Sequence, residues 1–295
     1  MIWRDPGGIA SLNLLYGAGG KENAPDPNAK FTFVEEDTQS SNPKFDVKDD
    51  RGVKWKVKLG QETQAETAAT RLLWAAGYFV DEDYYVAKLK VAGMPKLHHG
   101  EDFVSAGGTV HGARLERKPK DVKKLGNWDW FGNPFLGKRE MNGLKVMMSL
   151  LNNWDLKEIN NSIYEMDGER RYLVTDLGAT FGNTGNTLKR SKGSPKDYAG
   201  SKFIRNATPN FIDFVLHSRP FFLMAINVPY YRERTRMEKI TKHVPRADAK
   251  WLGGKLSMLS EEQIRDCFRA AGYAPEEIDI YTKVVRKRIT QLNAL

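Results

Sequence analysis

Hydrophobic and polar residues alternate over much of the first part of the chain, and this period of two predicts β-strands. Asp49-Asp-Arg-Gly52 separates two alternating segments, which indicates a hairpin. In the second segment Val53, Trp55, Val57 and Leu59 face one side, and Lys54, Lys56 and Lys58 face the other. The predicted strands comprise residues 11–16, 30–34, 44–48, 53–59, 84–91 and 112–117.

The pattern changes to a helical period directly after the lysine-bearing strand. Apolar residues recur on one face from Glu62 to Ala76, and Gly77 marks a stop. This apolar stripe consists of Ala65, Ala68, Ala69, Leu72, Leu73 and Ala76. A helix is therefore predicted to follow the strand that carries Lys58.

The rest of the chain is predicted to be mainly helical. Residues 118–134, rich in Lys, Gly and Trp, are typical of a linker, and a long helix is predicted from Gly137 to Trp154. A short hairpin from Ser162 to Val174 follows, and residues 182–200 form a polar loop of a length that is often functional. The last helices are predicted over residues 261–271 and 275–292. We therefore expect two parts, with a boundary between residues 118 and 119.

Composition narrows the class of protein without choosing a function. The chain has 295 residues, 40% of them hydrophobic and 28% charged, which is ordinary for a globular protein. No apolar run reaches the roughly 18 residues that span a bilayer, so we expect a soluble chain. The compartment stays open between the bacterial cytoplasm and export after removal of a signal, and the oligomeric state stays open too. The net charge of +9 favours anionic partners.

Two short motifs carry the candidate chemistry. Asp155 follows the long helix, and Asn160 comes five positions later, which is the separation of base and metal ligand in kinase catalytic loops. Asp155 would accept the proton of an acceptor hydroxyl, Lys157 would touch the transferred phosphate, and Asn160 would bind Mg²⁺. Asp176 follows a strand and precedes Leu-Gly, so the hairpin would return it to Asn160 as the main metal ligand. The alternative interpretation is a loop whose Asp and Asn residues serve as caps and turn formers.

Lys58 and Glu66 supply the second half of a phosphate site. Lys58 lies near the end of its strand and Glu66 in the next helix, so an ion pair could hold the lysine on the phosphates of a nucleotide. Lys56 shares the strand face, and Glu62 lies one turn before Glu66, so this register stays open. A solvated face of charged residues is the alternative interpretation.

These short motifs resemble those of the HipA-type and related atypical bacterial protein kinases, and more distantly those of the spore-coat CotH kinases and the secreted Golgi casein kinases. The resemblance covers roughly residues 38–180 and rests on Ser40-Ser-Asn-Pro-Lys-Phe45, the Lys58 strand, the Glu66 helix, and the Asp155 and Asp176 motifs. It implies an α+β, two-lobed protein-kinase-like fold with a strand-rich N-lobe (1–118) and a mainly helical C-lobe (119–295). It also implies that Ser40, Ser41 and Lys44 cover the phosphates. Gly17-Ala-Gly-Gly20 is a rival phosphate loop, although it lacks the kinase glycine spacing. Asn153-Trp154 replaces the His-Arg of ordinary protein kinases, which favours an atypical kinase.

The sequence therefore predicts an ATP-dependent phosphotransferase that uses Mg or Mn. Its acceptor, whether protein, sugar, lipid or metabolite, is left open. The alternatives are an inactive kinase-like scaffold and a nucleotidyltransferase on the same fold. A nucleic-acid binder is not expected, because the chain offers no helix-turn-helix or zinc finger.

Overall fold

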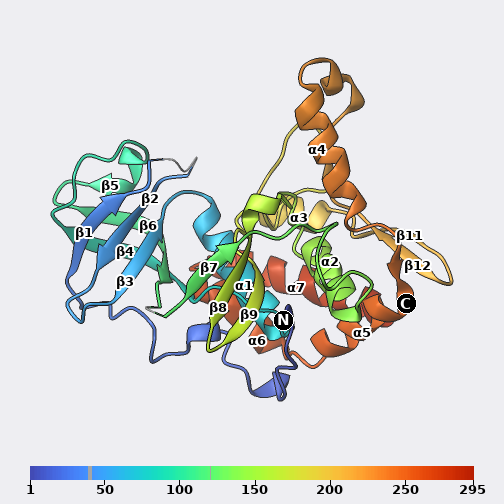
Figure 1. Ribbon diagram of the computed structural model, residues 1–295, viewed down its shortest axis with the longest axis horizontal. Helices are drawn as coiled ribbons and strands as arrows, with labels where there is room; N and C mark the ends of the chain where they lie inside the picture. The colour runs from blue at the N-terminus through green and yellow to red at the C-terminus, as the bar shows by residue number, and fades with distance from the viewer. Residues whose placement is uncertain (39–41, 120) are drawn as a thin grey trace.

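A small β-barrel forms the first part of the molecule, at the left of Figure 1. The structure is a computed structural model that describes residues 1–38, 42–119 and 121–295. The strands pair in the order β3-β2-β1-β4-β6-β5, and a further pairing of β3 with β6 closes the sheet on itself. Within this sheet β1 and β4 are parallel, and the other pairs are antiparallel. The strands are β1 (Phe31–Glu36), β2 (Lys44–Lys48), β3 (Lys54–Lys58), β4 (Asp83–Ala92), β5 (Val104–Ser105) and β6 (Thr109–Arg117).

The alternation predicted for β3 decides what lies inside the barrel. Trp55 and Val57 are buried in one hydrophobic cluster with Phe45 and Leu115. Lys58 lies on the opposite face of the strand, where α1 covers it. The strands predicted at 30–34, 44–48, 53–59, 84–91 and 112–117 are confirmed within one to three residues at most ends.

The strand predicted over residues 11–16 is wrong. Two short 3₁₀ turns, η1 (Ile9–Ser11) and η2 (Gly17–Gly19), lie at the two ends of this segment, with a loop between them. The side chain of Asn13 accepts hydrogen bonds from the backbone nitrogens of Leu15 (3.1 Å) and Tyr16 (3.3 Å), a local turn that competes with an extended conformation. Leu14 is instead buried in the helical core, and Leu12 packs against that core.

Helix α1 (Glu62–Ala75) lies between the barrel and the helical part. Its predicted apolar stripe is buried in the larger hydrophobic cluster, together with residues of α2, α6 and α7. The helix also packs against β4 and β6 of the barrel. Because it contacts both parts, α1 fixes the position of its two buried glutamates relative to both.

The first helix of the helical part is shorter than predicted, because it begins at Arg139 and ends at Leu150. α2 (Arg139–Leu150) stops four residues before Trp154 because Asn152 takes a left-handed conformation (φ 55°), which ends the helix. The predicted linker contains a strand, β7 (Lys123–Gly126), because its backbone pairs with β8 (Asn161–Met166). The predicted hairpin is confirmed as β8 and β9 (Glu169–Val174).

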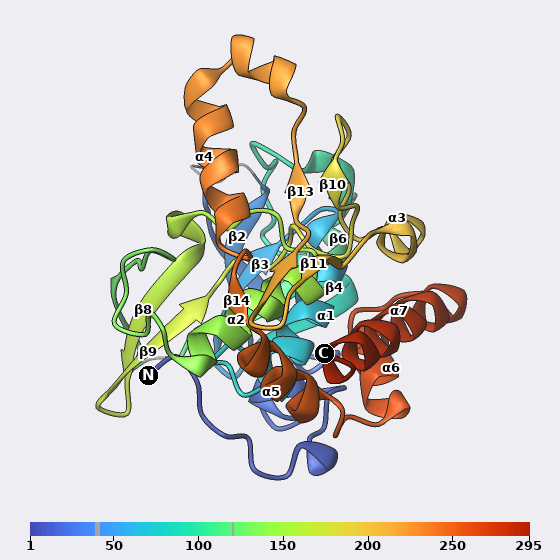
Figure 2. The ribbon, with the colours of Figure 1, turned by 90° about the vertical axis from the view of Figure 1, so that its right-hand side faces the viewer.

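The remaining elements complete the core and one projecting arm. Helices α5, α6 and α7 pack together and against α2 and α1. Figure 2 shows α4 standing away from this core. The elements are η3 (Glu101–Phe103), η4 (Glu158–Asn160), β10 (Gly185–Asn186), α3 (Pro195–Gly200), β11 (Ile204–Ala207), β12 (Phe211–Phe214), β13 (His217–Ser218), η5 (Phe221–Ala225), α4 (Val228–Lys239), β14 (Val244–Pro245), α5 (Arg246–Leu256), α6 (Glu261–Ala270) and α7 (Pro275–Asn293).

Two hydrophobic clusters organise the chain. The smaller one fills the barrel, and the larger one holds the helices together with α1 and the first residues of the chain, including Ile2 and Ile9. The boundary predicted after residue 118 follows β6 and remains a proposal. Within the described ranges, no helix is long and apolar enough to cross a membrane.

Candidate functional site

Lys58 is the centre of a buried charge cluster. Its side chain is 1% exposed, and its ammonium nitrogen lies 2.7 Å from Glu62 Oε2, 2.8 Å from Glu66 Oε2 and 3.4 Å from Asp176 Oδ1. The three carboxylates come from α1 and from the segment after β9. One lysine therefore joins the barrel, the helix and the predicted metal-binding motif.

The structure shows which of Lys56 and Lys58, and which of Glu62 and Glu66, form the ion pair. Both glutamates contact Lys58, because Glu62 and Glu66 lie one turn apart on the same face of α1. Lys56 instead lies 4.0 Å from Asp37, and its side chain is 31% exposed. Among the four predicted residues, Lys56 is thus the one outside the cluster.

Electrostatics favour a charged Lys58. Burial alone would lower its pKa, but Glu66, Asp176 and Glu62 raise that pKa above the ordinary value. Burial raises the pKa of Glu66, and Arg114 and Lys58 oppose this shift. For Asp176 burial also acts to raise the pKa, yet Lys58 and the backbone N–H of Gly178 lower it overall. The cluster therefore holds an ionised Asp176 beside a protonated lysine.

Lys44 joins this cluster from the neighbouring strand. Lys44 and Lys58 are directly opposite in the β2–β3 ladder, so their side chains share one face of the sheet. Burial, and next the charge of Lys58, lower the pKa of Lys44, while Asp176 and Glu66 act against this. An anion beside the two lysines would relieve their repulsion. Ser40 and Ser41, which the resemblance assigns to the same task, lie outside the described residues.

The hairpin returns Asp176 to Asn160, as predicted. The backbone nitrogens of Thr175 and Asp176 donate to Asn160 O at 2.9 and 3.4 Å. Gly178 follows closely, and a Cβ at this position would lie 2.6 Å from Glu62 Oε2. A glycine here lets the loop approach the glutamate that contacts Lys58.

Asp155 lies on the loop between α2 and η4, beside Asn160. The amide nitrogen of Asn160 donates to Asp155 O (2.8 Å) and Asp155 Oδ2 (3.2 Å). Lys157 Nζ lies 3.2 Å from Asp155 Oδ1, and Arg234 Nη1 lies 3.7 Å from the same atom. The predicted catalytic residues are therefore brought together around one carboxylate.

The donor set fits a divalent cation of the kinase type. Asn160 uses its amide nitrogen for Asp155, which leaves its carbonyl oxygen for a metal. Asp176 Oδ1 accepts from Lys58 and Gly178, and Oδ2 has no hydrogen-bonding partner in the described chain. In the same residues no group of three or more His, Cys, Asp or Glu side chains is arranged to hold a metal. Mg²⁺ commonly takes one or two protein oxygens and completes its shell with phosphates and water, so two donors suffice.

Sequence reasoning missed two basic residues of the cluster. Arg114 Nη2 lies 3.6 Å from Glu66 Oε1, and its Nε lies 2.9 Å from Asp83 Oδ2. Lys192, which belongs to the polar stretch 182–200, has its Nζ 2.5 Å from Glu62 Oε1. The parity of the predicted strand 112–117 could have placed Arg114 on the face of Lys58, but no local signal points to Lys192.

A group of arginines near Asp155 was also missed. Arg234 is 3% exposed and donates to Trp154 O at 2.6 Å. The Arg190 guanidinium lies over the Trp154 ring, 4.3 Å from its centre. Burial, together with Arg234 and Arg190, lowers the pKa of His217 to about 4. This side of Asp155 is therefore strongly cationic.

Other predicted features lie outside the cluster. The Gly17–Gly20 turn packs against Arg71 and Tyr84, since a Cβ on Gly17 or Gly19 would collide with those side chains.

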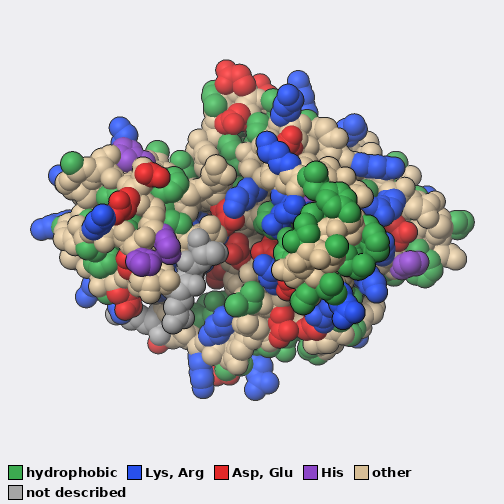
Figure 3. All heavy atoms as spheres, turned by 90° about the horizontal axis from the view of Figure 1, so that it is seen from above, with side chains coloured by type: hydrophobic (Ala, Val, Ile, Leu, Met, Phe, Trp, Pro, Cys, Tyr) green, Lys and Arg blue, Asp and Glu red, His purple; other side chains and the backbone are tan. Residues whose placement is uncertain are grey.

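Seen from above, Figure 3 shows the surface hollowed between the barrel and the helical part, with acidic and basic side chains together in the hollow.

Comparison with known proteins bears on the fold. No protein-family model matches the chain, and no curated protein matches it by sequence. Among solved structures it is similar to the crystal structure of a Helicobacter pylori proinflammatory kinase, CtkA, with a TM-score of 0.50 and 11% identity over 90% of this chain and 97% of that one. The fold is kinase-like. At this identity the likeness extends to the α+β architecture, with its strand-rich first part and helical second part, and no further.

Proposed function

We propose that this chain is an ATP-dependent phosphotransferase of atypical kinase type, which moves the γ-phosphoryl group to a hydroxyl acceptor with Mg or Mn. One observation carries the proposal: Lys58 is buried within 3.4 Å of carboxylates from both α1 and the Asp176 motif. Phosphoryl transfer needs a cation on the phosphates and a metal-binding carboxylate near it. A merely structural ion pair would not need Lys44 on the same face.

The roles of the individual residues follow from their positions. Lys58 and Lys44 would bind the phosphates, and Glu66 and Glu62 would hold Lys58 in place. Asp176 and Asn160 would hold the metal, which when bound would supply positive charge beside the phosphates. Asp155 would orient the acceptor hydroxyl and accept its proton, with Lys157 close to the transferred group. A HipA-type affiliation and the phosphate-covering role of Ser40 and Ser41 remain proposals.

Nucleotide binding and turnover test the proposal. Calorimetry with ATP should show binding that requires Mg²⁺ or Mn²⁺, and Asp176→Ala should abolish it while circular dichroism stays unchanged. Asp155→Ala should retain ATP binding but lose phosphate transfer to itself or to acceptors in a mixed panel. A protein that binds no ATP with either metal contradicts the proposal.

Two other functions on the same fold give different results. A scaffold would bind ATP weakly or not at all, and its behaviour would be indifferent to Asp155→Ala. A nucleotidyltransferase would add AMP to its target, so the mass of the modified product distinguishes it from a kinase. The wild-type enzyme should add the mass of one phosphoryl group for each site modified.

A further inference from the structure

A cavity lies away from the charge cluster around Lys58. It has a volume of about 530 Å³ and is bounded by residues 77–82, the end of β6 and the β8–β9 hairpin. This volume is within the range of roughly 300–1,000 Å³ that is usual for small-molecule sites. Lys58, Asp155, Asn160 and Asp176 are not among its lining residues. The cavity is therefore separate from the proposed phosphate site.

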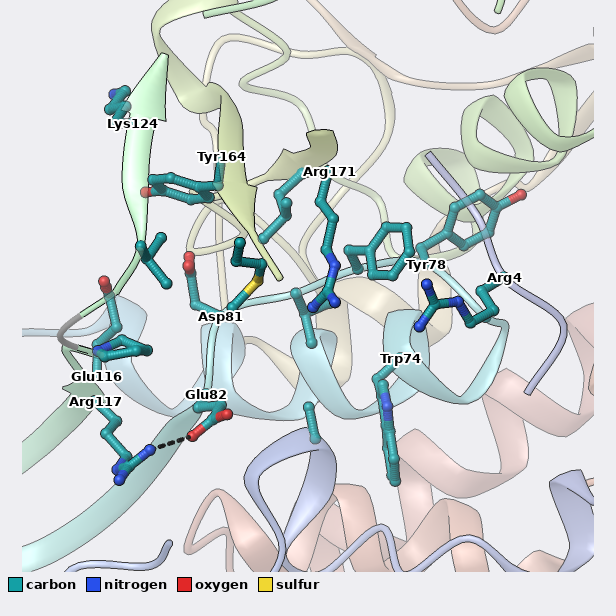
Figure 4. Close-up of a pocket in the computed structure, with 18 of the residues that line it drawn as sticks. Arg4, Trp74, Tyr78, Asp81, Glu82, Glu116, Arg117, Lys124, Tyr164 and Arg171 are labelled. Carbon is teal, nitrogen blue, oxygen red and sulfur yellow. Dashed lines mark ion pairs between the residues drawn. The ribbon is translucent and has the colours of Figure 1, made fainter. Parts of the chain in front are cut away.

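Most acidic side chains that line the cavity are matched by a basic partner. Glu82 pairs with Arg117 at 3.5 Å, and Glu116 pairs with Lys118 at 2.6 Å. Asp81 differs from them, because it has no hydrogen bond or ion pair with any residue in the described ranges. Figure 4 shows its carboxylate directed toward Tyr164 and the Glu82–Arg117 pair beside it. Within the described part of the cavity wall, Asp81 is thus an acidic group without a hydrogen-bonding or ion-pair partner.

The surroundings of Asp81 disfavour the charged form of its carboxyl. Burial raises the pKa of its carboxyl well above the ordinary value, and Glu116 adds to the shift. Arg114 of β6 and Lys118, which directly follows that strand, act against it, while Asp83 of β4 raises it further. Tyr164 of β8 also responds, since burial and the charge of Asp81 raise its pKa. The nearby cations are already paired with other carboxylates, so they offset the effect of burial on the pKa of Asp81 only in part.

The walls around Asp81 suit the organic part of a ligand. Trp74, Val122, Met166 and Tyr164 contribute apolar or aromatic surface. The Phe79 ring is occupied from within the protein, with Arg4 and Arg171 guanidinium groups 5.6 and 5.3 Å from its centre. Both of these arginines also have an acidic partner in Glu169, and Lys124 is exposed at the rim. Among the described carboxylates that line the cavity, Asp81 is then the one without a protein partner, so it can receive a donor from a ligand.

We propose that this cavity binds a small organic cation, an amidine, guanidine or amine carrying an apolar or aromatic body, with its charged group on Asp81. The body would pack against Met166 and Tyr164, and the cation would form a charge-assisted hydrogen bond with the carboxylate. Arg114 lies between this site and the catalytic cluster, because its Nη2 is 3.3 Å from Glu116 Oε2 and 3.6 Å from Glu66 Oε1. The site is new, and the binding does not depend on the proposed kinase activity.

Benzamidine and benzamide provide a matched pair of probes, because they have nearly the same shape and only benzamidine is charged. Calorimetry or ligand-observed NMR on the full chain should show a dissociation constant for benzamidine at least tenfold below that for benzamide. Asp81→Asn should remove this preference. Glu82→Gln, which changes a neighbouring carboxylate already paired with Arg117, should alter the constant less than threefold.

The pH dependence gives a second readout. Binding of the cation displaces the proton of Asp81, so affinity should rise up to tenfold per pH unit until the raised pKa is passed. The proposal is overturned if benzamide binds as well as benzamidine, or if Asp81→Asn retains the preference. It is also overturned if saturating ATP with Mg²⁺ displaces benzamidine competitively, because the probe would then occupy the catalytic cluster. Retained binding in Asp176→Asn would support the separate site.

Discussion

Replacing Lys58 by Met tests the central cluster most directly. Methionine has a similar length and no charge, so the change removes the ammonium group while it keeps most of the packing volume. Three carboxylates lose a partner at once. Glu62 retains Lys192 (2.5 Å), and Asp176 retains the Gly178 N–H (3.1 Å). Glu66, whose side chain is 2% exposed, keeps among the described residues just the longer contact with Arg114 (3.6 Å).

The expected cost follows from this inventory. Removing one partner of a buried ion pair typically costs about 3–5 kcal/mol, because the remaining charge is left uncompensated. Arg114 still compensates Glu66 in part, so we expect the lower end, about 3 kcal/mol of the free energy of unfolding. Against a total of roughly 5–15 kcal/mol for a domain, the variant should fold but unfold at a clearly lower denaturant concentration.

Urea unfolding followed by circular dichroism measures this loss. Lys56→Met is the matched control, since it removes an ammonium group from the same strand face where the side chain is 31% exposed and the ion pair is 4.0 Å long. It should cost less than about 1 kcal/mol. Adding Glu66→Gln to Lys58→Met should recover part of the loss, because the orphaned carboxylate is removed. Equal unfolding midpoints for the two single variants would refute the reasoning.

Three further predictions concern other parts of the molecule. Lys44→Met should raise the KM for ATP about 10-fold or more by removing a charged phosphate contact, with little change in unfolding free energy. An unchanged KM in steady-state kinetics would contradict this role of Lys44. Gly178→Ala should lower stability by about 1–3 kcal/mol and weaken metal-dependent ATP binding, because the new Cβ would meet Glu62 Oε2 at 2.6 Å; unchanged melting and binding would contradict the close approach. For Asp81, the raised pKa means that its protonated form contributes stability below the ordinary value of 3.8 and that this contribution is lost as pH rises through the folded-state pKa. Asp81→Asn should therefore melt progressively higher than wild type as pH rises, and thermal scans across pH that run parallel would count against it.

Local patterns predicted the parts of the site that depend on local structure. The alternation in residues 53–59 placed Lys58 away from the barrel interior, and the hairpin after Asn160 returned Asp176 to it. Strand parity is identical for Lys56 and Lys58, however, so it could not choose between them. The choice depends on where α1 crosses the sheet, which is a tertiary contact. The closure of β3 on β6 and the cation from Lys192 depend on long-range pairing in the same way.

Sequence patterns were misleading where a single polar side chain overrides them. Asn13 satisfies two backbone nitrogens in a stretch that alternates like a strand, and Asn152 ends a helix whose apolar pattern continues. In both cases the asparagine offers a local conformation that the hydrophobic period does not contain. The second case matters for function, because the early end of α2 leaves Leu151 to Trp154 as a loop. That loop positions Asp155 beside Asn160.

Helix α1 explains how a barrel and a helical core with separate hydrophobic clusters can share one site. Its alanine-rich stripe allows close packing on the helical core, whereas Glu62 and Glu66 face Lys58 on the barrel. A change in the packing of the stripe would therefore move both carboxylates relative to Lys58 and Asp176 together. Close-packed interfaces tolerate little added volume. A larger side chain in the stripe would therefore shift α1, and with it the glutamates of the charge cluster. The geometry around Lys58 is thus set as much by the alanines on the far side of α1 as by the charged residues themselves.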